Sequence, residues 1–389
     1  MPPPDPHLRH EWDLDPEFLT VNHGSFGATP RTVLAAQRAW QDRMERQPTR
    51  FMIAELPAAI RKAADDLGRF VNADGRDIVF ADNATTACNA VLRSLSLQPG
   101  DEVLILSHAY GAVRNAVRFV TQQAGAAITE AATPFPGPTE DGLVAAVADA
   151  ITPRTRLAVI DHITSGSAIV LPAARIVAAC HAFGVPVLID GAHAPGQIDL
   201  DIAAIGADWY AGNCHKWLCA PKGCAFLHAQ PARQEGLHPG TISHGFGKGF
   251  RAEFDWTGTT DPSRFLAVTA AIDFHHRLGG AALRELNRAL AAAGADCVAR
   301  RLDTEAGATG TLAAAMGTVR LPVGDASPEN ALAIRARLLA AGTDAPVHAL
   351  DGALWLRLST FAYNRTEDFV RLADIAAATL ATSAVVSGL

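Results

Sequence analysis

The chain is poor in charge and has no basic stripe. Only 19% of its 389 residues are charged, and the formal net charge at pH 7 is −7. This deficit of positive charge argues against a nucleic-acid partner. No apolar run approaches the roughly 18 residues that a membrane-spanning helix needs, so we expect no membrane partner. The N-terminal residues MPPPDPHLRHEW lack the apolar core of a signal peptide, and we therefore expect a cytoplasmic protein.

Cysteine is also scarce. Three of the six cysteines, Cys214, Cys219 and Cys224, lie around Lys216 at spacings of five. Zinc sites usually pair cysteines about two to four residues apart, so we predict no metal site. Buried small hydrophobic side chains are the better interpretation of these residues. No repeat or low-complexity tract is evident, and the length alone suits about two or three domains.

The stretch from residue 185 to residue 227 carries the strongest chemical signal. It contains three short apolar runs bounded by glycine and proline, a pattern typical of buried strands. The first run ends at Asp190, and the second ends at Asn213, shortly before Lys216. In open α/β sheets, ligands bind just beyond the carboxyl ends of the strands. Asp190 and Lys216 are therefore predicted to stand together at a ligand site.

An aspartate and a lysine at such positions suit one kind of cofactor. A lysine can form a Schiff base with an aldehyde such as pyridoxal phosphate, and an aspartate can keep the pyridine nitrogen protonated. The alternative is that Asp190 caps a loop and Lys216 is a solvated surface lysine. However, Lys216 stands between His215 and Trp217 among small and apolar residues, where an unpaired charge is unfavourable unless it has a function.

The motifs DGAHAPG, YAGNCHKWL and PKGCAFL, in this order, resemble the class V aminotransferase family of fold-type I, pyridoxal-phosphate-dependent enzymes. Within that family they most resemble the isopenicillin N epimerase-like branch. The likeness extends from the NHGSFG motif at residues 22–27 to Arg357-Leu358-Ser359. It is specific for cofactor and fold, and less so for reaction, because the branch includes epimerases and carbon–sulfur lyases.

The resemblance implies an α/β fold. Its large domain would hold a mainly parallel, seven-stranded-type sheet between helices, and a smaller α+β domain would follow. We expect an N-terminal arm and loop over residues 1–25, the large domain over 26–262 and the small domain over 263–389. Strands that alternate with helices also predict a parallel sheet. Apolar periodicity predicts helices over 32–46 and 56–70, and strands over 317–321 and 353–359.

The resemblance also implies site residues. The predicted catalytic residues are Lys216, Asp190, Tyr110 and His193. The predicted cofactor-binding residues are Ala84, Thr85, Tyr110, Asp161, Thr164, Asp190, His193, Asn213, His215, Lys216 and Thr259. The predicted substrate-binding residues are Asn22, His23, Arg50 and Arg357. In the family, the position of Thr259 reaches the cofactor phosphate of a neighbouring subunit, which implies a homodimer with shared active sites.

Plainer interpretations of these residues stay open. Helix capping alone explains the residue types around Ala84 and Thr85, although a helix N-terminus also suits a phosphate. Tyr110 matches the ring-stacking position better than His108, but ordinary packing would also explain it. Arg357 could form a structural ion pair, Arg50 could be solvated, and His23 could cap a turn.

Four functions remain for such a site. The first is epimerisation at the α-carbon of an amino acid or small peptide, and the second is β-elimination by a carbon–sulfur lyase on a cysteine conjugate or sulfoxide. Transamination is a third outcome. The fourth is a nucleotide- or cofactor-binding protein without catalysis. A persulfide-forming desulfurase is disfavoured, because it needs a mobile cysteine in the small domain and no cysteine follows Cys297.

Overall fold

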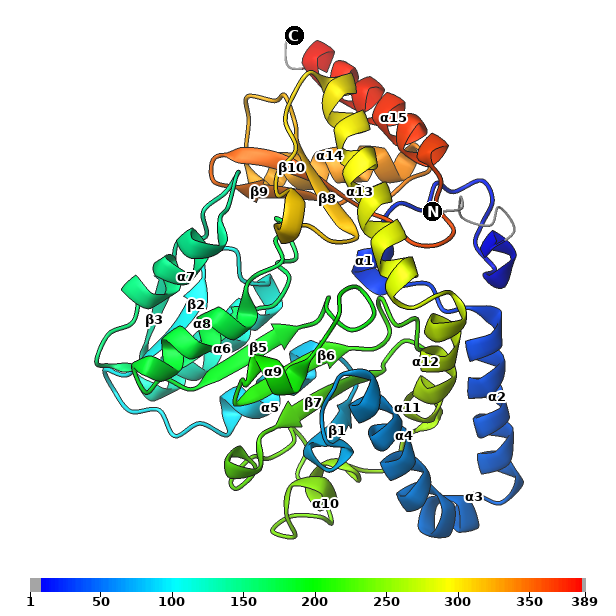
Figure 1. Ribbon diagram of the computed structural model, residues 1–389, viewed down its shortest axis with the longest axis vertical. Coiled ribbons are helices and arrows are strands. Elements are labelled where there is room, and N and C mark those ends of the chain that lie inside the picture. Colours follow the sequence, from blue (N-terminus) through cyan, green and yellow to red (C-terminus); the bar gives the residue numbers. More distant parts are fainter. Residues whose placement is uncertain (1–7, 387–389) are drawn as a thin grey trace.

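A seven-stranded sheet forms the centre of the molecule (Figure 1). The computed structural model describes residues 8–386, with side chains up to residue 381. The strands are β1 (Ile78–Ala81), β2 (Glu102–Leu106), β3 (Ala127–Ala131), β4 (Thr155–Asp161), β5 (Val187–Gly191), β6 (Trp209–Asn213) and β7 (Ala225–Ala229). Their order is β1-β7-β6-β5-β4-β2-β3, and β7 alone runs in the opposite direction to the other six. The predicted mainly parallel sheet is therefore confirmed.

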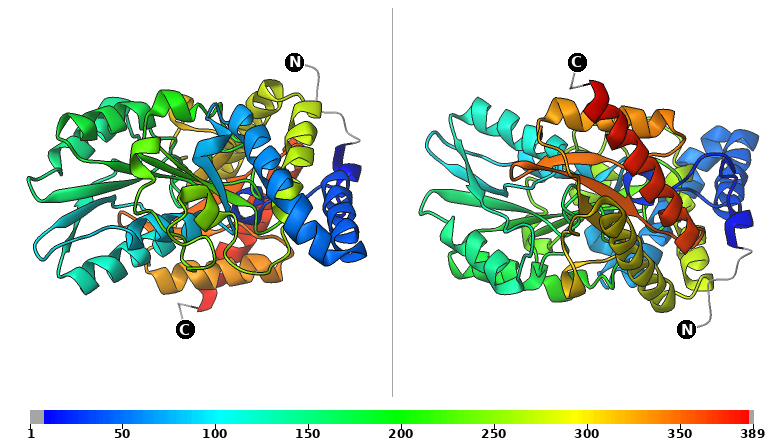
Figure 2. Two further views of the ribbon diagram at one scale, coloured as in Figure 1. Left: turned by 90° about the horizontal axis from the view of Figure 1, so that it is seen from below. Right: turned by 90° about the horizontal axis from the view of Figure 1, so that it is seen from above.

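Helices cover both faces of this sheet, as the turned views show (Figure 2). One face packs against α5 (Ala84–Arg93) and α6 (Gly111–Ala124), and the other against α4 (Leu56–Phe70), α7 (Glu140–Asp149) and α8 (Ala173–Ala182). Strand residues alternate between the two apolar clusters, so that Val103 and Ile105 face one and Leu104 and Leu106 the other. This alternation follows from the two-residue repeat of a strand, and it explains why the strands are apolar on both sides.

A second, antiparallel sheet lies at the top of the view in Figure 1. It has the order β8 (Met316–Arg320), β10 (Ala353–Ser359), β9 (Val347–Leu350). Helices α13 (Ala281–Leu302), α14 (Pro328–Ala340) and α15 (Thr366–Val386) accompany it. Leu354, Leu356 and Leu358 of β10 point into the apolar cluster that these elements share. Arg357, between the last two, therefore points to the opposite side.

The point at which the chain passes from the apolar cluster of the large sheet to that of the small sheet differs from the predicted domain boundary at residue 262. Helices α11 (Ser263–Leu266) and α12 (Val268–Arg277) contact α2 (Arg31–Arg46) and α4, and their apolar residues belong to the cluster of the large sheet. The second sheet and its helices have a cluster of their own, to which α13 contributes from Ala291 onward. By packing, residues 263–278 therefore go with the large sheet.

The N-terminal segment joins the two parts of the molecule. Leu19 and Val21 belong to the apolar cluster of the small sheet, and the backbone of Asn22 bridges to Ser359 of β10. The NHGSFG motif at residues 22–27 contains the one-turn helix α1 (His23–Phe26). The part of the predicted arm before residue 8 lies outside the described residues.

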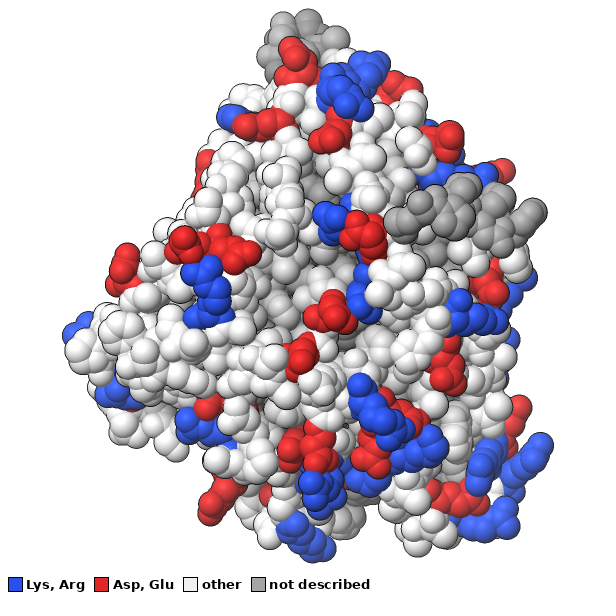
Figure 3. All heavy atoms as spheres, in the orientation of Figure 1, with Lys and Arg blue, Asp and Glu red and all other residues white. Residues whose placement is uncertain are grey.

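Short elements complete the chain. They are α3 (Pro48–Arg50), α9 (Ile202–Ile205), α10 (Phe250–Phe254), a π-helical turn at Phe51–Glu55, and 3-10 turns at Leu8–Glu11, Gly75–Asp77, Pro231–Arg233 and Gly310–Leu312. Among residues 8–386, no helix combines the length and apolarity needed to cross a membrane. Acidic and basic side chains are interspersed over the face seen in Figure 3.

Candidate active site

A cavity of about 370 Å³ lies at the carboxyl ends of β4, β5 and β6. Predicted residues that line it are Ala84, Thr85, Tyr110, Asp161, Asp190, His193, Asn213, His215 and Lys216. They come from the ends of parallel strands and from the first turns of the helices that follow. This edge of the sheet is where open α/β folds bind ligands.

Two carboxyl groups stand side by side in the floor of the cavity. Asp161 and Asp190 are register partners on β4 and β5, and both are buried. Burial raises the pKa of Asp190, although the Ala192 N–H that it accepts and the charge of Lys216 oppose the rise. Burial raises the pKa of Asp161 still further, because the charge of Asp190 adds to the effect. Of the two, Asp161 is therefore the carboxyl group that holds its proton more strongly.

Lys216 lies in the tight loop that follows β6. Its backbone is pressed against Gly27, where an added Cβ would lie 2.7 Å from the Lys216 carbonyl oxygen and 2.9 Å from its Cα. Gly27 also has a φ of +70°. Glycine is therefore required here both by the lack of space for a Cβ and by the backbone conformation. Burial and the charge of Arg357 lower the pKa of Lys216 to about 8, against the opposing effect of Asp190. A substantial fraction of the amine is therefore uncharged and nucleophilic near neutral pH.

Among the described residues, the amine of Lys216 has one side-chain hydrogen-bond partner, the imidazole of His193. Lys216 Nζ lies 3.2 Å from His193 Nε2, and the indole N–H of Trp217 donates to His193 Nδ1 at 3.3 Å. Burial lowers the pKa of His193 well below its usual value, and the charge of Lys216 adds to this. His193 is thus a neutral ring in contact with the reactive amine.

The start of α5 forms a third wall. Asn83 caps this helix, because its side-chain oxygen accepts the Thr86 N–H at 2.8 Å. Asn213 accepts the Ala84 N–H at 2.8 Å, so this predicted phosphate donor is already used within the chain. Thr85 is the remaining predicted donor there. His215 donates from Nδ1 to the Cys224 carbonyl at 3.1 Å, which turns Nε2 outward as an acceptor.

Arg357 is a buried cation without an acidic partner in the described part of the chain. Its Nη1 donates to the Ser165 carbonyl at 2.6 Å, and its Nη2 donates to Asn22 Oδ1 and Ser25 Oγ at 3.0 Å each. Its Nε is buried and has no acceptor. Burial lowers the pKa of Arg357 to about 10. The alternative of a structural ion pair is therefore not what the structure shows, and the site is complementary to an anion.

Six predicted site residues do not line the cavity. Two of them, Asn22 and Arg357, border it, because both are hydrogen-bonded to the lining residue Ser25. His23 is buried beneath it, where it contacts the Tyr363 hydroxyl and the Lys216 carbonyl and stacks on Phe361, so it supports the lysine loop from below. Thr164 is buried in a turn, where its hydroxyl accepts the Ile169 N–H. Arg50 is exposed and pairs with Glu55, and Thr259 is exposed in an irregular segment.

Other residues of the cavity were not predicted from the sequence. They are Ser25, Phe26, Asn83, Ile163, Ser165 and Ala192. Ser25 and Phe26 belong to the NHGSFG motif, but nothing in their residue types shows which members of the motif face a ligand. Ser165 directly follows a predicted residue, and only the turn geometry brings it to Arg357. No cluster of acidic, histidine and cysteine side chains suited to a metal occurs among the described residues.

Comparisons with known proteins identify the family of this chain. The profile of the family described as "Aminotransferase class-V" matches residues 28–369. The chain is 34% identical over 393 residues to a probable chloroplastic L-cysteine desulfhydrase of Arabidopsis thaliana, covering 92% of this chain and 82% of that protein. It is 34% identical over 390 residues to the isopenicillin N epimerase of Amycolatopsis lactamdurans, covering 95% and 96%.

Solved structures share the fold. A mutant of C-DES with glycine linked covalently to its PLP cofactor superposes with a TM-score of 0.79 at 23% identity, and the match covers 96% of this chain and 99% of that one. The family profile covers most of the chain, and both relatives align over nearly its whole length. The chain therefore belongs to the class V aminotransferase family of pyridoxal-phosphate-dependent enzymes.

Proposed function

We propose that this protein uses pyridoxal phosphate to remove the α-proton of an amino-acid-type substrate and to return it, as an epimerase does. The observation that supports the proposal is the pairing of Lys216 with Asp190 in one cavity, beside a buried arginine without a counter-charge. A volume of about 370 Å³ falls within the usual range of small-molecule sites. The amino-acid class of substrate follows from the family.

The residues present fit the cofactor. Asp190 would hold the pyridine nitrogen, Asp161 would face the phenolic oxygen, and Tyr110 would cover the ring. Thr85 and the side-chain N–H of Asn213 would hold the phosphate at the start of α5, where the helix N-terminus favours an anion. His215 would join them only when its Nε2 is protonated as well, because its Nδ1 proton is used by the Cys224 carbonyl. When bound, pyridoxal phosphate supplies an electron-withdrawing ring that stabilises negative charge at the α-carbon.

Arg357 would bind the substrate carboxylate. Its Nε is a buried donor without an acceptor, and its Nη2 is shared between the neutral oxygens of Asn22 and Ser25. A carboxylate could take a two-bond contact with Nε and Nη2, and it would neutralise the buried charge. Lys216, whose lowered pKa of about 8 leaves part of the amine uncharged near neutral pH, would then move the α-proton on one side of the substrate.

Epimerisation needs a second proton carrier on the other side of the α-carbon. Tyr110 is the candidate, because its phenol lines the cavity from the start of α6, away from the loop that carries Lys216. Arg50 and His23 do not line the cavity, so their predicted contacts with substrate draw no support from this chain alone.

A carbon–sulfur lyase is the second candidate. Relatives at 34% and 32% identity are named as L-cysteine desulfhydrases, and β-elimination needs only the Lys216 side of the site. A desulfurase is not supported, because no cysteine lines the cavity among the described residues and Cys297 lies on α13. Transamination shares the first proton transfer and is a third possible outcome.

One incubation separates these reactions. The purified protein is mixed with amino acids and cysteine conjugates in deuterated water, and α-deuterium, pyruvate and keto acids are measured together. Deuterated amino acid of both configurations supports the epimerase. Pyruvate with a released thiol supports the lyase, and a keto acid that keeps its side chain supports transamination. Absence of all products, and of α-exchange, from the whole panel with a protein that has bound the cofactor would contradict the proposal.

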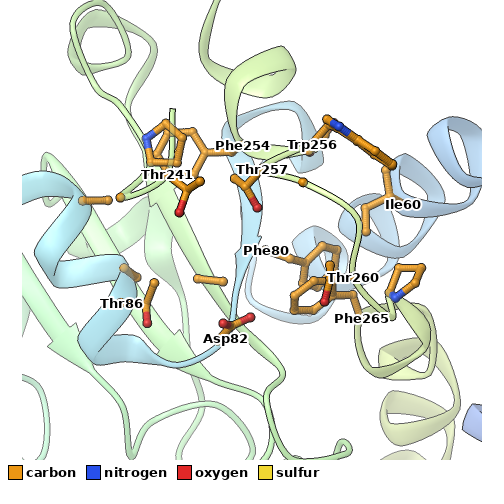
Figure 4. A pocket seen from close by; sticks show the side chains of 18 of the residues that line it. Ile60, Phe80, Asp82, Thr86, Thr241, Phe254, Trp256, Thr257, Thr260 and Phe265 are labelled. Carbon is orange, nitrogen blue, oxygen red and sulfur yellow. The ribbon is translucent and has the colours of Figure 1, made fainter. Parts of the chain in front are cut away.

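We also propose a homodimer whose partner chain completes each site. Thr259 is exposed on its own chain, as a residue that reaches into another subunit should be. Beside it, a second cavity of about 160 Å³ lies between α4, the first turns of α5 and the segment at residues 254–265 (Figure 4). Aromatic rings of Phe80 and Phe265 stack in its wall at 5.2 Å.

Exposed apolar side chains support an interface near this second cavity. Ile53 and Ile242 are more than half exposed, and each lies within three residues of the cavity residues Leu56 and Thr241. Apolar side chains exposed together commonly mark protein contacts. The cytoplasmic location and the domain limits expected from the sequence remain part of this proposal.

A further inference from the structure

We propose that Trp217 fixes the proton of His193 on Nε2 and thereby favours the uncharged amine of Lys216. The proposal rests on three groups in a row: the Trp217 indole, the His193 imidazole and the Lys216 amine. Trp217 and His193 are both buried, so water does not compete for these contacts. The part that concerns a reactive lysine rests on the proposed function, whereas the position of the imidazole proton does not.

The first step concerns the imidazole. An indole N–H can only donate, so the nitrogen that it contacts must accept. Trp217 Nε1 lies 3.3 Å from His193 Nδ1 with its hydrogen directed at that atom. Nδ1 therefore carries a lone pair, and the single proton of the neutral ring is on Nε2. A doubly protonated ring is excluded in this geometry, because both nitrogens would then be donors.

The surroundings of His193 also oppose a charged ring. Burial lowers its pKa, and the nearby basic groups Lys216, Arg357, His215 and His348 all act in the same direction. No acidic group is among the causes of the shift. The ring is thus neutral at physiological pH, and the contact with Trp217 determines which of its two tautomers is favoured.

The second step concerns the lysine. With its proton on Nε2, His193 is a donor toward Lys216 Nζ at 3.2 Å, and Nζ must accept. An uncharged amine has a lone pair for this contact, whereas an ammonium group has none. Charging Lys216 would therefore break either this contact or that between Trp217 and Nδ1. The row of three groups lowers the affinity of the amine for a proton, in addition to the effects of burial and Arg357.

The fold brings the indole to this place by close packing. A Cβ added at Gly24 would lie 3.1 Å from Trp217 Cζ2, so a larger residue there would push the ring. The carbonyl of His193 accepts the side-chain N–H of Gln197 at 2.7 Å, which holds the backbone from which the imidazole projects. Trp217 is thus a positioning residue that acts on Lys216 through His193.

Nitrogen-15 NMR of the full chain tests the tautomer. With ¹⁵N-labelled histidine, the His193 signals are assigned by their loss in His193→Gln. Before loading with pyridoxal phosphate, the parent should show a protonated Nε2 and an unprotonated Nδ1. Trp217→Phe removes the donor and keeps an aromatic ring, so His193 should shift toward a mixture of both tautomers. Trp40→Phe, at a partly buried tryptophan that does not contact His193, is the matched control and should leave the parent pattern.

The pH dependence of cofactor capture tests the lysine. The rate at which the cofactor-free chain binds pyridoxal phosphate should follow the uncharged fraction of Lys216. In Trp217→Phe its midpoint should rise by about one pKa unit, the size expected for one buried hydrogen bond. Trp40→Phe should leave the midpoint unchanged. If Trp217→Phe does not fold, a benzothienylalanine at position 217, which has the shape of tryptophan without the N–H, replaces it.

The outcomes are distinct. A parent His193 with its proton on Nδ1 would overturn the proposal, as would a donor-free variant with an unchanged His193 pattern and an unchanged midpoint. A shifted pattern together with a raised midpoint supports it. If Lys216 captured no cofactor in the parent, the proposed function would fail. The NMR result on the tautomer would still stand for or against Trp217.

Discussion

Single residues at this site are held in charge states that water would not favour. Burial raises the pKa of both Asp161 and Asp190, that of Asp161 more strongly, and leaves Lys216 partly uncharged. The buried cation of Arg357 has no acidic partner in the described chain. Displaced pKa values in a cavity are a feature of catalytic sites, although structural networks can also produce them. Here the altered groups line or border one cavity, which favours the catalytic interpretation.

The two neighbouring carboxyl groups should respond differently to the same change. Asp190→Asn removes the charge that would hold the pyridine nitrogen, and we expect turnover to fall by at least about 10²–10⁴-fold, the range of a lost acid–base contribution. Asp161→Asn is the matched control and should cost far less, because burial and the charge of Asp190 favour the protonated form of Asp161, which an amide resembles. Steady-state kinetics of both variants, with the bound cofactor measured by absorbance, would check this. Equal losses would contradict the assignment of charge to Asp190.

Arg357→Lys should weaken substrate binding and leave the cofactor in place. A lysine supplies charge, but not the planar two-bond contact that a carboxylate prefers. A charged hydrogen bond is worth roughly 1.5–3 kcal/mol, so apparent affinity should fall about ten- to a hundred-fold for every amino acid tested. Spectral titration of the loaded enzyme measures this. Arg320→Lys, at an exposed arginine paired with Glu305, is the control and should bind as the parent does. Unchanged binding in Arg357→Lys would mean that the carboxylate is held elsewhere.

At the level of elements, the start of α5 combines a stability role with a binding role. Asn83 caps the helix and also lines the cavity. Asn83→Ala should therefore lower the free energy of unfolding by about 1 kcal/mol and also weaken retention of the cofactor. Thr139→Ala removes the equivalent cap of α7, which does not line the cavity, and should cost similar stability without loss of cofactor. Urea unfolding and dialysis against cofactor-free buffer separate the two effects, and equal cofactor loss in both variants would argue against a phosphate site at α5.

Elements with a strong repeat could be predicted from the sequence, and irregular ones could not. The apolar strands near Asp190 and Asn213 and the helices over 32–46 and 56–70 are where their periodicity placed them. The one-turn helix α1 and the π-helical turn at Phe51–Glu55 are too short to show a repeat. The packing of α11 and α12 against the large sheet could not be predicted for a related reason, because the sequence shows their apolar faces but not which sheet those faces meet.

At the level of the whole molecule, the site depends on contacts that sequence spacing does not reveal. Arg357 donates to Asn22 across 335 positions of the chain, and His193 meets Trp217 only because β5 and β6 are neighbours. The family resemblance predicted which residues belong to the site. It did not show that His23 lies beneath the lysine loop or that Asn213 occupies the Ala84 N–H. Such facts follow from packing, which is set by all elements together.

The proposed interface should be sensitive to charge at one exposed position and not at another. Ile242→Glu places a carboxylate beside the second cavity, where a partner chain would have to bury it, and we expect monomers at concentrations at which the parent is a dimer. Leu332→Glu, on the exposed side of α14, is the matched control and should remain a dimer. Sedimentation velocity would measure both, and a dimeric Ile242→Glu would place the interface elsewhere.

Mixing two inactive variants tests whether the partner completes the site. Lys216→Ala removes the reactive amine, and Thr259→Ala should weaken the hold on the phosphate in the other subunit. In a mixed dimer, one site would combine the intact Lys216 of one chain with the intact Thr259 of the other, while the second site would lack both. The two variants share the same twofold interface, so their chains can form mixed dimers after they are dissociated and allowed to pair again. Activity should then rise above that of either variant alone. If Thr259 acted within its own chain, every site of the mixed dimer would still lack one of the two groups, and mixing would restore nothing.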